Sequence, residues 1–197
     1  LLIRDVSFTL HASESCLIMG PSGCGKSSVL RTLAGLWPIF RNPNQRSHEA
    51  RCMRPDSRHV FFLAQQPYIC AGSSLRQQVA YPVWDNQLID DLSDANMMRL
   101  FRQAGLEQMW EKRCNDLDRC DLPWVDVLSL GEQQRLQFCR LFWHQEWHQK
   151  QADARSCFFA VLDESTASMD VQAEMQVYQS CRERKLGFLS VAHRPTV

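Results

Sequence analysis

Apolar residues gather in short runs along the chain, and polar segments with helical spacing lie between them. Runs of four to six apolar residues bounded by polar or turn residues have the length of buried strands. Four such runs occur: Cys16–Met19, Val60–Leu63, Cys157–Leu162 and Gly187–Ala192. Apolar and polar positions also alternate from Val6 to His11, which is typical of a half-buried strand.

Helical periodicity fills the longest gap between these runs. Met97, Leu100, Phe101 and Ala104 fall at i, i+3, i+4 and i+7, so they define one face of a helix that Ser93 can cap. Further helices are expected over 28–34, from residue 128 onward and over 171–184. Strands that alternate with helices predict an α/β sheet, and a helical insertion is expected from about residue 71 to 145.

Composition narrows the function classes. The chain has 197 residues, 45% of them hydrophobic and 22% charged, which suits one globular domain. Its 22 basic and 22 acidic residues cancel, so no global attraction to nucleic acid or a membrane surface is expected. The arginine-rich segment 41–58 is interpreted as a solvated loop, with a nucleic-acid contact as the alternative.

Cysteine usage and the apolar runs bear on the setting of the chain. Nine cysteines without a C-x-x-C pair indicate free thiols in a reducing compartment. No apolar run reaches the roughly 18–20 residues that cross a bilayer. No signal peptide is expected from the first residues, which are strand-like, and the chain is expected to be one domain of a longer protein.

The chemistry centres on a loop that reads G-x-x-x-x-G-K-S and lies between an expected strand and an expected helix. Glycines let the backbone N–H groups approach an anion, and the helix N-terminus adds its positive dipole end. Lys26 can contact β- and γ-phosphates, and the Ser27 hydroxyl can ligate Mg²⁺. The loop comprises Gly20, Pro21, Ser22, Gly23, Cys24, Gly25, Lys26 and Ser27.

Polar residues follow three of the expected strands: Gln65, the pair Asp163 and Glu164, and His193. Ligands of open α/β sheets bind beyond the carboxyl ends of strands, so these groups are expected near the loop. Asp163 suits Mg²⁺, and Glu164 suits deprotonation of a water that faces the γ-phosphate. Gln65 can bridge metal and water, and His193 can donate to a γ-phosphate oxygen.

A second feature is the Ser129-Leu130-Gly131 turn that opens a helix. Taken alone, this turn is either a helix cap or a second anion-binding helix terminus.

The ordered set of motifs resembles an ABC transporter nucleotide-binding domain. Gly20–Ser28 is similar to Walker A, Gln65 to the Q-loop and Leu128–Glu132 to the signature. Asp163-Glu164 is similar to Walker B with its catalytic glutamate, Ala167–Asp170 to the D-loop and His193 to the switch histidine. The sequence around Gly35-Leu36-Trp37 and Gln66-Pro67-Tyr68 resembles that of the peroxisomal fatty-acyl subfamily, subfamily D. Leu128–Arg135 is also similar to bacterial cobalamin and peptide-uptake proteins.

The resemblance implies an α/β P-loop NTPase core with a mostly parallel central sheet, an N-terminal antiparallel β portion and an inserted α-helical subdomain. Residues 1–70 and 146–197 would form the core, and 71–145 the helical subdomain. Glu164, His193 and Gln65 would be catalytic, and Ser27, Gln65 and Asp163 would hold Mg²⁺. ATP would contact three further groups: Ser28, the pair Ser129 and Gly131, and Asp170.

The resemblance also implies partners and a place in the cell. A second nucleotide-binding domain would stack head to tail, so that its signature turn completes the ATP site. A transmembrane domain of the same or another chain would use the ATP cycle, and no nucleic acid is expected. The ATPase domain would face the cytosol at a peroxisomal, other organellar or bacterial inner membrane. Fatty-acyl or related hydrophobic substrates are expected.

Departures from the family pattern are few. Leu130 replaces the first signature glycine, and Met169 replaces a leucine. Trp143–Ser156 is expected to be a surface loop, with His144 and His148 at a solvated helix end, and chelation of a metal by this i, i+4 pair is the alternative. Two other functions stay open: a soluble ABC-type ATPase, and a module that closes on ATP without turnover.

Overall fold

A computed structural model describes residues 7–38, 52–85, 89, 92–113, 116–151 and 157–192. Its centre is a four-stranded sheet, with the strands in the order β1-β4-β3-β2. The strands are β1 (Ser15–Ile18), β2 (Val60–Leu63), β3 (Phe159–Asp163) and β4 (Gly187–Val191). Every neighbouring pair is parallel, so the four carboxyl ends meet at one edge of the sheet. These four strands confirm the prediction that each apolar run forms a buried strand.

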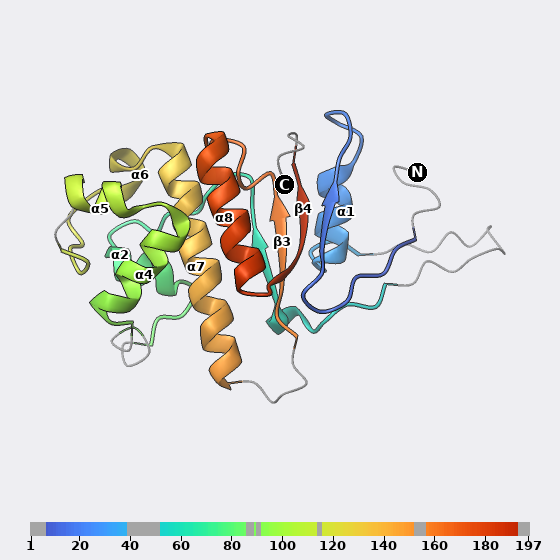
Figure 1. Cartoon of the computed structure of the whole chain (residues 1–197), viewed down its shortest axis with the longest axis horizontal. Coiled ribbons are helices and arrows are strands. Elements are labelled where there is room, and N and C mark those ends of the chain that lie inside the picture. The colour runs from blue at the N-terminus through green and yellow to red at the C-terminus, as the bar shows by residue number, and fades with distance from the viewer. Residues whose placement is uncertain are drawn as a thin grey trace.

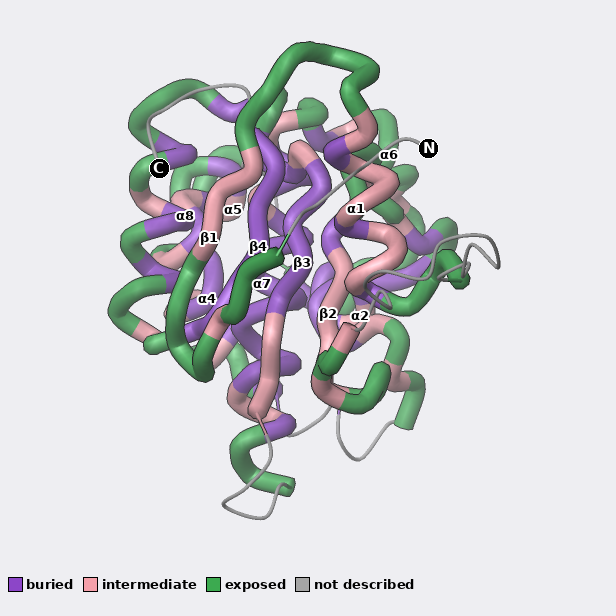
Figure 2. Tube along the Cα trace, turned by 90° about the vertical axis from the view of Figure 1, so that its right-hand side faces the viewer, coloured by how far each residue is buried: buried purple, intermediate pink, exposed green. Residues whose placement is uncertain are grey.

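The two faces of the sheet are covered by different helices, as Figure 1 shows. Side chains alternate along a strand, so Val161 of β3 packs with Leu30 of α1 (Lys26–Leu33). Its neighbours Ala160 and Leu162 belong instead to the core cluster that contains α7 (Leu130–Gln151) and α8 (Val171–Glu183). Figure 2 shows β3 and β4 as largely buried, as expected for a sheet covered on both faces.

Shorter helices lie on the side of α7 away from the sheet (Figure 1). They are α2 (Leu75–Ala80), α4 (Asp94–Ala104), α5 (Glu107–Arg113) and α6 (Trp124–Val127); a 3-10 turn, η1 (Ser57–His59), precedes β2. The Ser93 side chain accepts from the Asn96 N–H and caps α4, as predicted. Gly105 ends α4 with φ of 70°, a conformation that glycine adopts without strain. Helix α7 runs across residue 145, and the division into a core and a helical subdomain at 71 and 145 stays a prediction.

The structure corrects the expected loop after Trp143. Helix α7 continues to Gln151, and both His144 and His148 are buried in it. The His144 ring donates from Nε2 to the Tyr81 carbonyl at 2.7 Å, and His148 Nε2 is in hydrogen-bond contact with His59 Nδ1. The prediction of a solvated helix end was wrong because distant polar partners satisfy these rings inside the core.

The expected strand from Val6 is not found over residues 7–10, which are irregular. A strand needs a neighbour that pairs with its backbone, and the described sheet contains only the four parallel strands. An antiparallel β portion is therefore absent from the described ranges, and residues 1–6 lie outside them.

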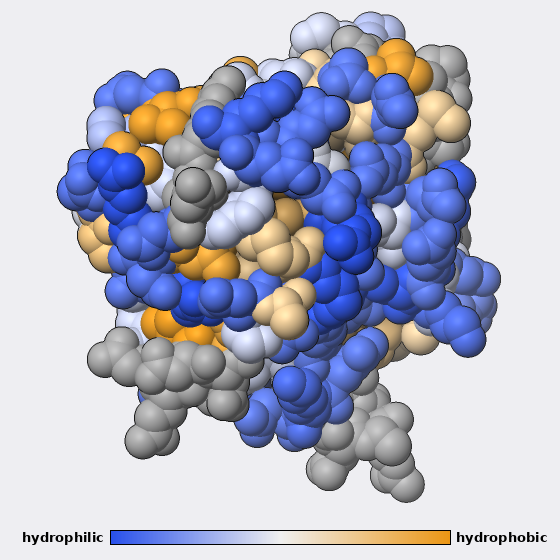
Figure 3. All heavy atoms as spheres, turned by 60° about the vertical axis from the view of Figure 1, so that its left-hand side comes forward, coloured by the Kyte–Doolittle hydropathy of each residue, from blue (hydrophilic) through white to orange (hydrophobic). Residues whose placement is uncertain are grey.

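The described part of the chain contains no helix long and apolar enough to span a bilayer. The face in Figure 3 is mostly hydrophilic, and its hydrophobic residues lie in small separate groups.

Candidate nucleotide site

The phosphate loop joins the end of β1 to the start of α1, as its motif predicts. Gly23 and Gly25 adopt φ of 78° and 96°, left-handed conformations that a side chain would strain. Lys26 is only 6% exposed, and its Nζ donates to the carbonyls of Gly20 and Pro21, each at 2.8 Å. The loop therefore holds its ammonium group beside the N-terminus of α1, where a phosphate anion is favoured.

Asp163 ends β3 and points to the side of the sheet that α1 covers. It lies two residues after Val161, so the alternation of the strand turns both to the same face. Its Oδ1 accepts from the Ser27 hydroxyl at 2.7 Å, and Asp163 is 2% exposed. A hydroxyl and a carboxylate are hard oxygen ligands, so the pair fits Mg²⁺.

Gln65 and Glu164 meet at the same edge of the sheet. The Gln65 amide donates from Nε2 to Glu164 Oε2 at 2.9 Å. Glu164 directly follows β3 and has φ of 50°, a conformation that non-glycine residues rarely adopt. Its N–H donates to the Val191 carbonyl at 3.1 Å, so the end of β4 fixes the backbone that presents this carboxylate.

One residue of the candidate site was missed by the sequence analysis. Arg31 lies one turn after Ser27 on α1, and its Nη2 is 3.7 Å from Asp163 Oδ2. The i, i+4 spacing from Ser27 was the signal that could have identified it. His193, by contrast, lies outside the described residues, although β4 ends two residues before it.

The signature turn is built as a capping box. The Ser129 Oγ accepts from the Glu132 N–H at 3.3 Å, and the Ser129 N–H donates to Glu132 Oε2 at 2.8 Å. A Cβ at Gly131 would lie 2.8 Å from the Ser168 carbonyl oxygen, so only glycine allows this close approach. The turn therefore rests directly on the D-loop of the same chain.

Asp170 has a structural role at the end of the D-loop. Its Oδ1 accepts from the Ala173 N–H at 2.8 Å and caps α8. This hydrogen bond holds the pKa of Asp170 below its usual range, so the carboxylate is charged at neutral pH.

The predicted site residues form two groups. Lys26, Ser27, Gln65, Asp163 and Glu164 lie at the carboxyl edge of the sheet, joined by the contacts above. The second group is the signature turn and the D-loop, and in Figure 1 α8 and the sheet lie between the start of α7 and α1. The predicted site residues of one chain therefore lie in two separate groups, here called half-sites.

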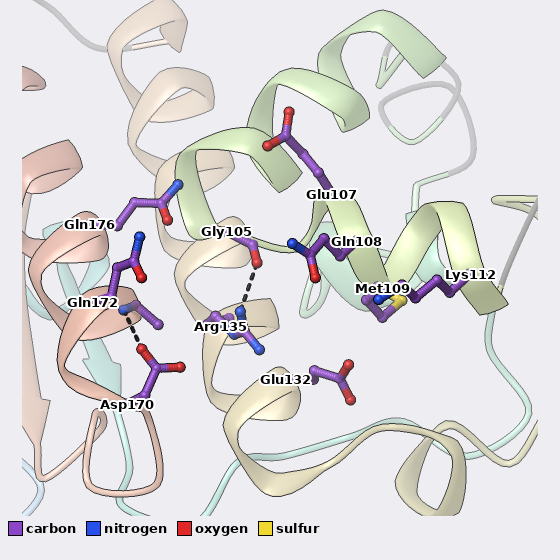
Figure 4. A pocket seen from close by; sticks show the side chains of 11 residues that line it. Gly105, Glu107, Gln108, Met109, Lys112, Glu132, Arg135, Asp170, Gln172 and Gln176 are labelled. Atoms are coloured by element: carbon purple, nitrogen blue, oxygen red, sulfur yellow. Dashed lines mark hydrogen bonds between the residues drawn. The ribbon is translucent and has the colours of Figure 1, made fainter.

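A pocket of about 420 Å³ lies beside the second group (Figure 4). It is lined by α5, the first turns of α7 and the start of α8, and Arg135 crosses it to donate from Nη1 to the Gly105 carbonyl at 2.7 Å. Glu132 and Asp170 contribute to its wall, whereas residues 20–27 do not.

The fold and the site define a phosphate-binding α/β domain, and comparisons with known proteins give its family. The family model described as "ABC transporter" matches residues 3–147. ATP-binding cassette sub-family D member 3 of Homo sapiens is 34% identical over 197 residues, which are 100% of this chain and 27% of that protein. The lysosomal cobalamin transporter ABCD4 of Mus musculus is 36% identical over 200 residues, covering 100% of this chain and 30% of that protein.

The chain therefore belongs to the ABC transporter family, as a nucleotide-binding domain with relatives in subfamily D. An uncharacterized ABC transporter ATP-binding protein of Synechocystis is 36% identical over all of this chain and 26% of its own length. This chain thus spans between a quarter and a third of these relatives. A bacterial Atm1-family ABC exporter with ATP bound has the same fold, with a TM-score of 0.69 at 20% identity over 98% of this chain and 32% of that one.

Proposed function

We propose that this domain binds and hydrolyses ATP to drive transport across a membrane. The observation that carries the proposal is the convergence of two side-chain pairs, Ser27 with Asp163 and Gln65 with Glu164, beside the phosphate loop. Loop, metal ligands and a carboxylate base at one sheet edge are the parts that phosphoryl transfer to water requires.

Each residue has a proposed role at this edge. Lys26 and the loop N–H groups bind the β- and γ-phosphates, and Ser27 and Asp163 hold Mg²⁺, with Gln65 as a further ligand. Bound Mg²⁺ neutralises charge on the phosphate oxygens. Glu164 accepts a proton from the attacking water, and the Gln65 amide holds that carboxylate in place. His193 follows β4 and donates to the γ-phosphate.

The second half-site is proposed to act on the ATP of another domain. Ser129 is exposed at the start of α7, where the helix N-terminus favours an anion. In a head-to-tail dimer, Ser129 and Gly131 clasp the γ-phosphate held by the partner domain, and Asp170 lies along the seam. ATP closes this dimer and hydrolysis opens it.

The cycle is proposed to move a transmembrane domain, with this domain on the cytosolic side. The substrate is proposed to be a fatty-acyl compound or a related hydrophobic compound, because the sequences of the motifs resemble those of the peroxisomal subfamily. A relative that is 36% identical to this chain is named a cobalamin transporter, so cobalamin is the comparison ligand. A fatty-acyl compound that raises ATP hydrolysis of the membrane-embedded protein, where cobalamin does not, supports this substrate; the reverse result contradicts it.

ATP hydrolysis is tested with purified complete protein. Lys26→Ala removes the buried cation of the loop, so phosphate release is expected to fall about a hundredfold or more. Lys150→Ala, an exposed lysine at the far end of α7, is the matched control and keeps its rate. If the unmodified protein binds ATP but releases phosphate no faster than Lys26→Ala, at concentrations that allow dimerisation, the domain is an ATP-gated module without turnover.

A further inference from the structure

Gln134 connects the two half-sites within one chain. It lies on the first turns of α7, shortly after the signature turn, and is 1% exposed. Its Oε1 accepts from the Ser168 N–H in the D-loop at 2.9 Å. Its Nε2 faces the Gln65 carbonyl of the Q-loop at 3.4 Å, a longer contact.

Both ends of this amide match their partners in hydrogen-bond polarity. An N–H faces the amide oxygen, and a carbonyl faces the amide nitrogen, so one orientation satisfies both loops. Neither loop has regular secondary structure at these residues. A buried side chain that bonds two irregular loops restricts how either can move without the other.

We infer that Gln134 is a positioning residue for ATP hydrolysis, which sets the Q-loop and the D-loop relative to each other. The inference rests on the proposed function. Through the Gln65 backbone, Gln134 fixes the residue whose side chain holds Glu164 at 2.9 Å. Through Ser168, it fixes the backbone on which Gly131 rests. When the signature turn binds ATP of the other domain and shifts, Gln134 therefore transmits that movement to the carboxylate base, Glu164, of the same chain.

The first test is Gln134→Met in the complete protein. Methionine keeps the length of the side chain and forms neither hydrogen bond. The kcat for ATP hydrolysis is expected to fall about tenfold or more, because misplaced catalytic groups lower the rate of the chemical step. The KM for ATP is expected to stay within about twofold, because phosphate-loop contacts are unchanged. Hydrogen exchange of the Ser168 amide is expected to become faster.

Gln145→Met is the matched control on the same helix. Gln145 is 3% exposed and donates to the Arg184 carbonyl at 3.1 Å, far along α7 from both loops. The Gln145→Met variant is expected to lower the melting temperature as Gln134→Met does, while its kcat and the hydrogen exchange of its Ser168 amide stay as in the unmodified protein. A general loss of stability would instead affect both variants alike.

Gln134→Glu supplies a conservative rescue. Burial raises the pKa of a carboxyl, and its protonated form carries both an acceptor and an O–H donor, as the amide does. The ratio of kcat for Gln134→Glu to kcat for the unmodified protein is therefore expected to increase as the pH is lowered from 8.5 to 6. A positioning role predicts this rise, whereas a purely space-filling role predicts a flat ratio.

The outcomes separate the two proposals. Failure of the unmodified protein to hydrolyse ATP overturns the proposed function. An active protein whose Gln134→Met variant keeps kcat within about twofold, or keeps Ser168 protected from exchange, overturns the role of Gln134 and leaves ATP hydrolysis intact.

Discussion

Neighbouring residues of the phosphate loop differ sharply in access to solvent. Lys26 is buried, whereas Cys24, two residues before it, is exposed and carries a free thiol. The Cys24 thiol therefore lies within reach of reagents on the loop that would contact phosphate. A small side chain at this position leaves room for the anion, and a large adduct would occupy that room.

Alkylation of Cys24 is expected to abolish ATP binding, because the adduct would lie in the phosphate cradle. Equilibrium binding of a fluorescent ATP analogue, measured before and after treatment with N-ethylmaleimide, checks this. Cys24→Ser is the control and is expected to resist the reagent while other cysteines still react. If ATP that is bound before the reagent is added does not slow the loss of analogue binding, the result would argue against the prediction.

His144 illustrates how burial changes the chemistry of one side chain. Burial lowers the pKa of His144 to about 4, so the ring is neutral in the folded protein at physiological pH. Because Nε2 contacts the Tyr81 carbonyl, the neutral ring carries its proton on that nitrogen.

A pH dependence of stability follows. The unfolded ring takes up a proton near pH 6.5 and the folded ring only near pH 4, so the free energy of unfolding falls as pH drops between these values. The expected loss from pH 7 to pH 5 is about 2 kcal/mol. His144→Gln keeps an N–H donor for Tyr81 and cannot titrate, so urea denaturation should show a shallower slope with pH. An identical slope in the two proteins would rule out His144 as its source.

At the scale of elements, α7 connects several parts of the fold. Its Glu146 carboxylate accepts from Nη1 and Nη2 of Arg99 on α4, each at 2.7 Å. Arg184, just after α8, lies 2.7 Å from the same carboxylate. Burial alone would raise the pKa of Glu146, but the two arginines outweigh burial and hold the pKa below its usual range.

Glu146→Gln is expected to lower the free energy of unfolding by about 1–3 kcal/mol at pH 7, because two arginines lose a charged acceptor. The lowered pKa of Glu146 means that this stabilisation is fully present above the ordinary carboxyl range and is lost as pH falls through that range and below it. The difference in the free energy of unfolding between Glu146→Gln and the unmodified protein, measured by chemical denaturation, should therefore shrink toward zero at acidic pH.

The control for Glu146→Gln is an exposed pair. Glu107 accepts from Arg102 Nε at 2.9 Å, but the two side chains are 48% and 70% exposed. Solvent screens such a pair, so Glu107→Gln is expected to cost less than about 1 kcal/mol. Equal losses in the two variants would show that the Glu146 network adds nothing beyond a surface contact.

The elements that sequence analysis predicted correctly are those whose signal is local. Apolar runs located all four strands, and the glycine-rich motif located the junction of β1 and α1. The start of α7 was also predicted, but its continuation past Trp143 was not, because polar side chains on several of its faces are buried and the apolar spacing is lost there. The partners of His144 and His148 lie 63 and 89 residues away in the chain, so spacing along α7 could not reveal them. The same holds for Gln134, whose two partners come from separate loops.

At the scale of the whole molecule, the proposed function requires a second domain, because the two half-sites lie apart on one chain. Gly131 lies against the Ser168 carbonyl of its own D-loop, and in Figure 1 α8 and the sheet lie between the start of α7 and α1. The dimer proposed above is therefore the state in which both groups can contact one nucleotide.

Glu164→Gln is expected to bind ATP and to accumulate as a closed dimer, because the base that would activate water is lost while the phosphate contacts remain. Light scattering coupled to size-exclusion chromatography measures the mass with and without ATP. Addition of Ser129→Arg places a bulky cation in the clasp and is expected to restore the monomer. A Glu164→Gln variant that stays monomeric with saturating ATP would contradict the sandwich arrangement.

The length of α7 has a mechanical consequence for such a dimer. Its 22 residues span about 33 Å, from the signature turn to the end beyond His148. A rigid rod of that length acts as a lever: a tilt of about 10° around its midpoint moves each end by about 3 Å, in opposite directions. Its far end contacts His59 at the entrance to β2, the strand that leads to Gln65. A tilt produced by closure at the signature end would therefore displace the start of the strand whose other end leads to Gln65, the amide proposed to hold Glu164.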